Sequence, residues 1–187
     1  MAIRDWTIVD LLEVIRQPKP AWGGGSAGAV AGAMAFALIE KISLIAKIDA
    51  NELTSLRNNL LQWAEDDTLA YQTMIKPSGD SSRSIQNINN SLEISAKIAE
   101  GCLSGIQTSG DLMALVKPGL RADLFVAAHL CYTGCYSAVA NIKTNAERLY
   151  PQSDWLDTCR HLGRRLDEAA GNIHRWMVHY PVSEICY

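Results

Sequence analysis

The residues that interrupt regular structure are gathered at four places in this chain, and this clustering limits what it can fold into. Glycine and proline concentrate in QPKPAWGGG, in KPSGDSS, between residues 108 and 119, and at Pro151. Between these places the apolar residues recur at intervals of three and four, the spacing of one helix face, rather than in strand-type alternation. The chain is therefore expected to be all-α.

The same breakers divide the chain into helices. We expect short helices over 7–17 and 111–116, and five long ones over 26–49, 51–75, 82–107, 120–150 and 153–178. An N-cap residue accepts hydrogen bonds from first-turn amides through a short polar side chain. Four such residues stand at the expected starts: Ser26, Asn51, Ser82 and Ser153. Long helices joined by short turns favour an antiparallel up-and-down bundle, which 187 residues suit as one domain over 1–187.

Charge and cysteine content exclude other classes of protein. A net charge of -3 and a pI near 5.8 give no basic surface for nucleic acid. The opening MAIRDWTIVDLL carries charges within its apolar stretch and has no small-residue cleavage site, unlike a signal peptide. The 5 cysteines are odd in number and lack compact spacing, which fits buried thiols in a reducing compartment. We expect a cytoplasmic protein that binds no nucleic acid.

The stretch PAWGGGSAGAVAGAMAFALIE, residues 20–40, admits three interpretations. Gly23, Gly25 and Gly28 spell G-x-G-x-x-G, but the dinucleotide-binding motif follows a strand, and IRQPKPAW with its two prolines precedes these glycines. The 14 uncharged residues over 26–39 fall short of the roughly 20 that span a membrane. A core helix remains, and no membrane is expected as a partner.

One face of this helix carries almost no side chain. Gly25, Gly28 and Gly32 follow one another at i, i+3 and i+7. A bare face lets another backbone approach closely, so Gly28 and Gly32 predict tight packing inside the bundle or across a dimer interface. The segment Gly23 to Ser26 differs, because free amides and the positive dipole end at a helix start can receive an anionic or carbonyl group.

Five short elements then occur in order along the chain: GGGSAGAVAGAMAFAL, DTLAY at 67–71, RSIQ at 83–86, DLFVA at 123–127 and NIKTN at 141–145. Together they resemble the cyclodeaminase domain of formiminotransferase-cyclodeaminase and the related bacterial methenyltetrahydrofolate cyclohydrolases. The glycine element is the most specific of the five. The resemblance implies an all-helical bundle, a homodimer, and action on folate-bound one-carbon units with no metal and no cofactor besides the tetrahydrofolate substrate.

The resemblance leaves three functions open. Hydrolysis of 5,10-methenyltetrahydrofolate to 10-formyltetrahydrofolate is favoured, because no transferase domain is fused to the chain. The first alternative is formiminotetrahydrofolate cyclodeaminase, which releases ammonia. Trp22 replaces a proline of the family pattern, Ala122 replaces a serine, and Pro118-Gly119 replaces a glycine-asparagine pair. These departures motivate the second alternative, a non-catalytic or repurposed helical dimer.

The chemistry itself indicates which residues to consider. Adding water to a cationic methenyl carbon requires a carboxylate to hold the charge, a base to orient the water and an acid to protonate the departing nitrogen. Asp67 shares a helix face with Tyr71 and Met74, so apolar neighbours are expected to raise its pKa. Asp66 is expected to point toward solvent. The alternative is that the whole segment Glu65 to Asp67 is an ordinary solvated acidic face.

Asp123 and Asn141 complete the expected catalytic set. They lie 18 residues apart on one helix, roughly 27 Å along its axis, and cannot act on one atom from a single chain. We expect Asn141 at the Asp67 end of the bundle and Asp123 at the other, serving a partner subunit's site or the far end of a long ligand. The expected substrate-binding residues at the Asp67 end are Gly23, Gly24, Gly25, Ser26, Tyr71, Lys76, Arg83, Lys143 and Asn145.

Overall fold

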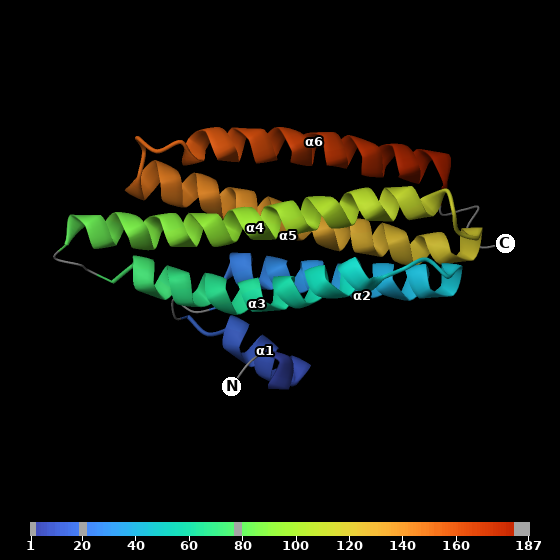
Figure 1. The fold of residues 1–187 in the computed structure, drawn as a ribbon, viewed down its shortest axis with the longest axis horizontal. Coiled ribbons are helices and arrows are strands. Elements are labelled where there is room, and N and C mark those ends of the chain that lie inside the picture. The colour runs from blue at the N-terminus through green and yellow to red at the C-terminus, as the bar shows by residue number, and fades with distance from the viewer. Residues whose placement is uncertain (1–2, 19–21, 77–79, 182–187) are drawn as a thin grey trace.

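The computed structural model of this chain describes residues 3–18, 22–76 and 80–181. Every regular element in these ranges is a helix, and five of the helices are long, which confirms the predicted all-α bundle (Figure 1). The long helices are α2 (Gly24–Ala46), α3 (Asn51–Met74), α4 (Ser81–Met113), α5 (Arg121–Leu149) and α6 (Trp155–His179). The short elements are α1 (Ile8–Ile15) and the 3-10 helices η1 (Ile3–Asp5) and η2 (Pro118–Leu120).

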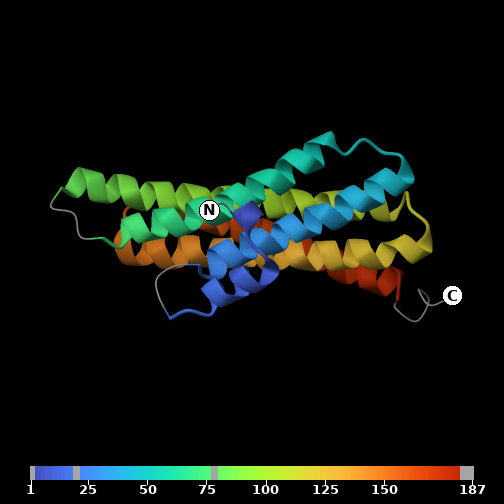
Figure 2. The same ribbon diagram turned by 90° about the horizontal axis from the view of Figure 1, so that it is seen from below.

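The long helices run up and down in turn, with α5 near the centre. It packs against α2, α4 and α6, while α3 packs against α2 and α4. Figure 1 shows α6 covering α4 and α5 on one side of the bundle and α1 lying on the opposite side. Figure 2, seen from below, places α1 near the N-terminal half of α2. No residue of α1 is buried, so the core belongs to the five long helices.

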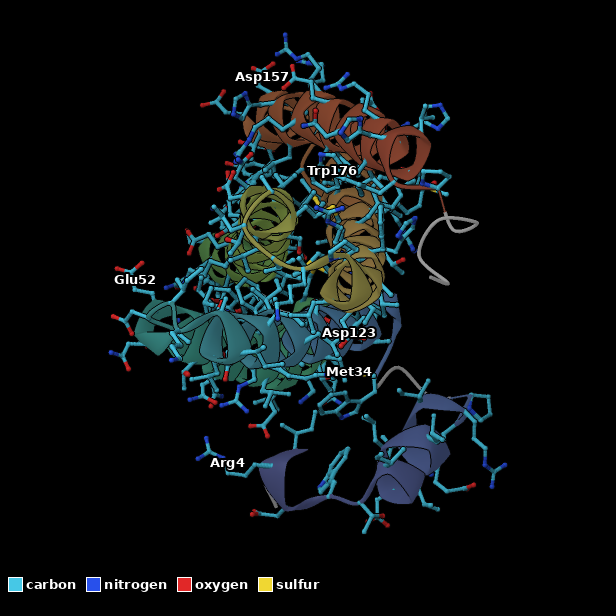
Figure 3. All side chains as sticks on the ribbon, turned by 90° about the vertical axis from the view of Figure 1, so that its right-hand side faces the viewer. Arg4, Met34, Glu52, Asp123, Asp157 and Trp176 are labelled. Carbon is cyan, nitrogen blue, oxygen red and sulfur yellow. The ribbon has the colours of Figure 1, made fainter. Side chains whose placement is uncertain are left out.

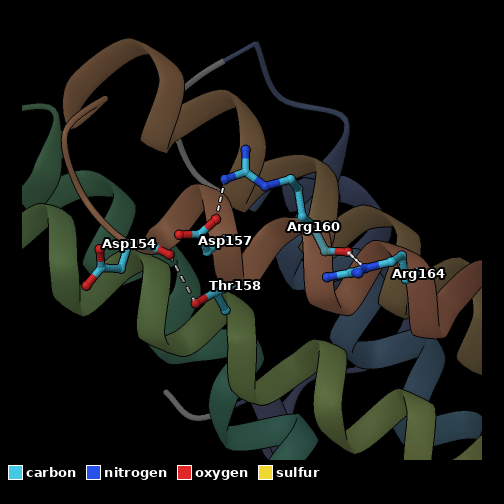
Figure 4. A network of polar contacts seen from close by, with 5 residues as sticks. All are labelled: Asp154, Asp157, Thr158, Arg160 and Arg164. Carbon is cyan, nitrogen blue, oxygen red and sulfur yellow. Dashed lines mark hydrogen bonds and ion pairs between the residues drawn. The ribbon is translucent and has the colours of Figure 1, made fainter.

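The outer face of α6 is polar. Near its start, Arg160 forms an ion pair with Asp157, and Arg164 Nε donates to the carbonyl oxygen of Arg160 at 3.4 Å (Figure 4). Thr158 Oγ1 donates to the carbonyl of Asp154, also at 3.4 Å. These bonds stay within one helix and its cap, so this face of the bundle is covered by solvated side chains.

Helix α4 is longer than predicted. It runs without interruption to Met113, so the predicted end at Gln107 and the separate helix over 111–116 are wrong. The reason is Gly110, which reads as a breaker in sequence but lies inside the helix beneath Trp176 of α6. A Cβ at this position would lie 2.3 Å from Trp176 Cζ2. This glycine therefore makes room for an indole rather than ending a helix.

The four predicted N-caps are wrong by one to three residues. The observed N-caps are Gly23, Ala50, Asp80 and Asp154. Asp80 Oδ1 accepts the Ser82 amide at 2.9 Å, which is the role expected of Ser82 itself. Ser26 lies within the first turn of α2, so its hydroxyl is not used for capping and reaches another helix.

The bare face of α2 is explained by packing within the bundle. At the crossing of α2 and α5, Gly28 and Gly134 meet backbone to backbone, and a Cβ on Gly134 would lie 2.6 Å from the Gly28 carbonyl oxygen. One turn further along α2, a Cβ on Gly32 would lie 2.8 Å from Cys102 Sγ of α4. Gly28 and Gly32 are both buried, and they allow approaches that an alanine would prevent.

The crossing predicts a stability effect for Gly134→Ala. The added methyl must displace the Gly28 carbonyl or the Cys102 sulfur, so we expect the free energy of unfolding to fall by about 1–3 kcal/mol. In the control Gly163→Ala the new Cβ has no atom within 4 Å, and better helix propensity should raise stability by up to about 1 kcal/mol. Urea denaturation of both variants tests this, and equal stabilisation would contradict the close crossing.

Helix α2 is also long and apolar enough to cross a membrane by length and composition alone, with a mean hydropathy of 1.8. The 14 uncharged residues counted in the sequence underestimate the length of this helix, which extends over 23 residues and passes Glu40 and Lys41. In the structure α2 packs against α3, α4 and α5, and 44% of its apolar window is buried. That packing gives α2 the place of a core helix.

Candidate functional site

Asp67 lies on α3 two turns before the helix ends, and its side chain is turned into the bundle. Only 8% of the residue is exposed, so the solvated acidic face is the wrong interpretation for Asp67. Ser26 Oγ of α2 donates to Asp67 Oδ2 at 2.8 Å, and the hydroxyl oxygens of Ser26 and Thr68 are 3.0 Å apart. The adjacent Asp66 is half-buried and accepts a bond from Gln62 Nε2 at 3.1 Å.

Gly25 is the point where three helices meet. A Cβ built on it would lie 2.5 Å from Asn141 Nδ2 of α5 and 2.7 and 2.8 Å from the two carboxylate oxygens of Asp67. No side chain fits there without displacing one of these groups. The start of α2 thus brings a buried carboxylate and a side-chain amide together around a bare backbone position.

The backbone at the start of α2 adds hydrogen-bond donors to this centre. Its N-cap is Gly23, whose side chain cannot cap, and its first backbone bond runs from the Ala27 amide to the Gly23 carbonyl at 2.9 Å. The amides of Gly24, Gly25 and Ser26 therefore have no acceptor within the helix. Gly23 and Gly24 are exposed, so this positive helix end faces both solvent and the carboxylate.

Burial raises the pKa of Asp67 above its usual range, and hydrogen bonds from the Ser26 side chain and backbone oppose the rise. Burial is the larger cause because the charged form loses most of its contact with water. A carboxyl with a raised pKa exchanges protons closer to neutral pH. That property suits a general acid or base.

The raised pKa predicts a pH dependence of stability. Above an ordinary aspartate pKa of about 4, the unfolded chain loses this proton before the folded chain does. The free energy of unfolding therefore falls as pH rises toward the raised pKa. Asp67→Asn lacks this titration, so wild type minus variant stability should decrease as the pH rises above about 4, until the raised pKa of Asp67 is passed. Urea midpoints measured across that range test it, and a constant difference would contradict the shift.

The other expected substrate-binding residues lie around the same end of the bundle, where α3 and α5 end and α4 begins (Figure 1). Tyr71 is one turn beyond Asp67 and 37% exposed. The remaining four lie near the ends of these helices. Asn145 is half-buried, and three are exposed: Lys76, Arg83 and Lys143. In the described part of the chain, none of these four forms a hydrogen bond or ion pair with Asp67, so they share its end of the bundle without joining it.

Asp123 lies at the opposite end, as its spacing from Asn141 predicts. Its Oδ2 forms an ion pair with Lys41 Nζ at 2.5 Å. Lys41 is 15 residues beyond Ser26 on α2, which is about 22 Å along the helix axis. Figure 3 looks at this end of the bundle and shows Asp123 near the first turns of α5. Within one chain Asp123 is therefore not part of the Asp67 centre.

Two residues of the centre were missed in the sequence. Thr68 contacts the Ser26 hydroxyl, and Ser137 of α5 lies beside Gly24, where a Cβ would be 3.2 Å from its Oγ. Ser137 could have been found, because Gly134, Ser137 and Asn141 follow at i, i+3 and i+7 and form a small and polar stripe along α5.

The centre thus offers one carboxylate, hydroxyl groups, a side-chain amide and backbone amides. Over residues 3–18, 22–76 and 80–181, no three His, Cys, Asp or Glu side chains are grouped to hold a metal ion. The cysteines in these ranges are free and buried, as expected: Cys102, Cys131, Cys135 and Cys159. The residues at the centre can hold a substrate by hydrogen bonds and transfer protons.

Comparisons with known proteins bear on the family and the fold. The family model described as formiminotransferase-cyclodeaminase matches residues 7–157. The crystal structure of formiminotetrahydrofolate cyclodeaminase from Thermotoga maritima superposes with a TM-score of 0.84 at 16% sequence identity, covering 92% of this chain and 96% of that one. No curated protein matches. At this identity the structural likeness carries the fold alone.

Proposed function

This chain belongs to the formiminotransferase-cyclodeaminase family, and from that premise we propose that it is a formiminotetrahydrofolate cyclodeaminase. The observation that carries the proposal is the buried Asp67, bonded to Ser26 at the start of α2 and placed beside Gly25 and Asn141. The activity named for the Thermotoga maritima structure supports cyclodeamination. Hydrolysis, which the sequence favoured, becomes the second candidate.

Cyclodeamination needs one proton to move between two nitrogens. The formimino group reacts in its protonated, amidinium form, whose nitrogen already carries two protons. The N10 amine attacks its carbon and a carbon–nitrogen bond forms. The formimino nitrogen takes the N10 proton and leaves as ammonia, giving the cationic methenyl bridge. Asp67 accepts the proton from N10 and returns it to the departing nitrogen. A carboxyl whose pKa is raised by burial can carry out both transfers.

The neighbouring groups hold the reacting parts in place. The Ser26 hydroxyl donates to Asp67 Oδ2 at 2.8 Å, and the Ser26 backbone also bonds this carboxyl. These bonds fix the orientation in which Asp67 meets the substrate. The amide of the exposed Gly24, at the positive end of α2, receives a carbonyl oxygen of the folate ring, and Asn141 donates from its amide nitrogen. The exposed residues Lys76 and Arg83 are suited to the carboxylates of the glutamate tail.

Methenyltetrahydrofolate cyclohydrolase is the second candidate, favoured by the exposure of Gly23 and Gly24 beside the buried carboxylate. Water reaching the centre from this side adds to the cationic methenyl carbon and gives one proton to Asp67. As the carbon–N5 bond breaks, N5 receives that proton, and the remaining hydroxyl proton is released to solvent to leave the formyl group. The same residues serve both reactions because each passes through a tetrahedral carbon between N5 and N10.

One chromophore separates these functions. Methenyltetrahydrofolate absorbance rises when a cyclodeaminase is given 5-formiminotetrahydrofolate, and falls when a cyclohydrolase is given the methenyl compound. We expect the rise with purified protein, and a rate near that of buffer with Asp67→Asn. A fall alone would assign the hydrolase. No change with either compound, together with no folate binding by calorimetry, would support the third possibility, a helical dimer without catalysis.

The position of Asp123 leads us to propose a homodimer whose cleft is shared between subunits. Asp123 of one copy would then serve the Asp67 centre of the other. Mixing Asp67→Asn subunits with Asp123→Asn subunits tests this, because a hybrid dimer retains one intact centre. Restored activity is expected, and its absence after confirmed subunit exchange would contradict the shared cleft.

A further inference from the structure

Trp22 directly precedes the glycine turn, Gly23 to Ser26, and its indole is paired with that of Trp6. The two ring centroids are 5.1 Å apart with the planes tilted by 50°, a geometry of favourable aromatic contact. Trp22 also packs against the buried core. Trp22 is one of the chain's departures from the family pattern, so the family's known residues do not account for this pair.

The segment that carries Trp6 is anchored to α3 close to Asp67. Ile3 is buried, at 9% exposure, and its backbone amide donates to the side chain of Glu65, two residues before Asp67. Figure 3 shows this N-terminal segment, with Arg4 labelled, beneath the bundle. Trp6 therefore follows an attachment to the helix that carries the carboxylate.

The other side of Trp6 is also fixed. Thr7 caps α1 in a reciprocal capping box with Asp10, the Thr7 amide donating to Asp10 Oδ2 at 2.9 Å and the Asp10 amide to Thr7 Oγ1 at 3.1 Å. Helix α1 itself buries no residue. Ile3 and the indole of Trp6, which precede α1, attach this part of the chain to the bundle.

These contacts join the two elements that form the centre. Through Ile3 the segment holds α3, which carries Asp67, and through Trp6 it holds Trp22 at the entry to α2, which carries Ser26. The 2.8 Å bond between Ser26 and Asp67 depends on the register of these two helices. Because residues 3–6 are attached to both helices, this segment restrains their register.

We propose that Trp6 is a positioning residue, which acts through Trp22 to hold the glycine turn against Asp67. This inference rests on the proposed function for its kinetic consequence but not for its structural one. Trp6 touches Trp22 rather than the reacting groups. Its removal therefore lowers the rate of the chemical step and leaves substrate affinity nearly unchanged.

The test compares Trp6→Ala with Trp6→Phe and with Trp176→Phe, which alters an indole at the far end of α6. We expect Trp6→Ala to lower kcat on the order of tenfold to a hundredfold, since small misplacements of reacting groups have such effects, with KM within about twofold. Trp6→Phe should recover most of the rate because the phenyl ring still contacts Trp22. Trp176→Phe should leave kcat unchanged.

Hydrogen exchange measures the same effect without any turnover. In Trp6→Ala the amides of residues 27–30, the first that are bonded within α2, should exchange at least about tenfold faster than in the wild type, while those around Gly134 keep their rates. An unchanged exchange rate would overturn the proposal whatever the activity. Suppose that exchange is faster in Trp6→Ala but the wild type is inactive on both folates. The positioning role of Trp6 would then stand, and only the proposed function would be refuted. A rise in KM with kcat unchanged would also overturn the positioning role, because Trp6 would then be a binding residue.

Discussion

Replacing Asp67 by asparagine is expected to lower the rate of turnover on the order of 10²- to 10⁴-fold, the range found for general acid–base groups. The amide has the shape of the carboxyl and can still accept the Ser26 hydroxyl, so the fold should be retained. It cannot take a proton from N10 and pass it on. Single-turnover rates from the methenyl absorbance, with thermal melts as a check on folding, measure the effect.

Asp66 provides the matched control. It is the neighbouring acid on α3, bonded to Gln62 at 3.1 Å, and it lines a separate cavity of about 320 Å³ between α3 and α4. Asp66→Asn should change the rate by no more than about twofold, since surface substitutions away from special contacts have small effects. If both variants lost activity equally, the acidic segment as a whole, rather than the buried carboxyl, would be responsible.

Placing a single methyl group on Gly25 is expected to have the second largest effect. The new Cβ would lie within 2.8 Å of Asn141 Nδ2 and both oxygens of Asp67, so at least one of these groups must move. A displacement of about 1 Å at reacting groups can lower a rate on the order of a hundredfold. The stability cost should remain near 1–3 kcal/mol. Steady-state kinetics and urea denaturation of Gly25→Ala separate the two effects.

Gly24→Ala is the informative neighbour. Its Cβ would meet only the Ser137 hydroxyl, at 3.2 Å, and a hydroxyl can rotate away. We therefore expect Gly24→Ala to keep most of the activity while introducing the same backbone restriction in the same helix turn. Equal loss in both variants would mean that backbone freedom, rather than the space beside Asp67, is what the glycines provide.

The fold class was predictable from the sequence because helical periodicity is a local property. Spacing of apolar residues located all five long helices, and their ends fell within three residues of those observed, except for the C-terminal end of α4. The errors arose where one residue has two physical uses. Gly110 was taken as a breaker, whereas Trp176 requires its lack of a side chain, and only the packing of α4 against α6 reveals this.

The candidate site was predictable in part. Asp67 followed from its pattern on α3 and from the family resemblance, and its burial agrees. The partner that holds it was not predictable, because Ser26 lies 41 residues earlier and reads as an N-cap. Gly25 was expected to present an amide. In the structure its lack of a side chain also leaves room for the side chains of Asn141 and Asp67. Such contacts depend on how three helices meet, which no local pattern specifies.

The backbone contact between Gly28 and Gly134 has a mechanical consequence for the ends of α2. The close backbone contact makes this crossing the point about which a tilt of α2 would pivot. Gly25 lies three residues away, a lever of about 4.5 Å, whereas Lys41 lies thirteen residues away, about 20 Å. The same tilt therefore displaces the Lys41 end roughly four times as far as the glycine turn. The carboxylate centre therefore lies at the end of α2 that a tilt displaces least, and the ion pair between Lys41 and Asp123 lies at the end that it displaces most.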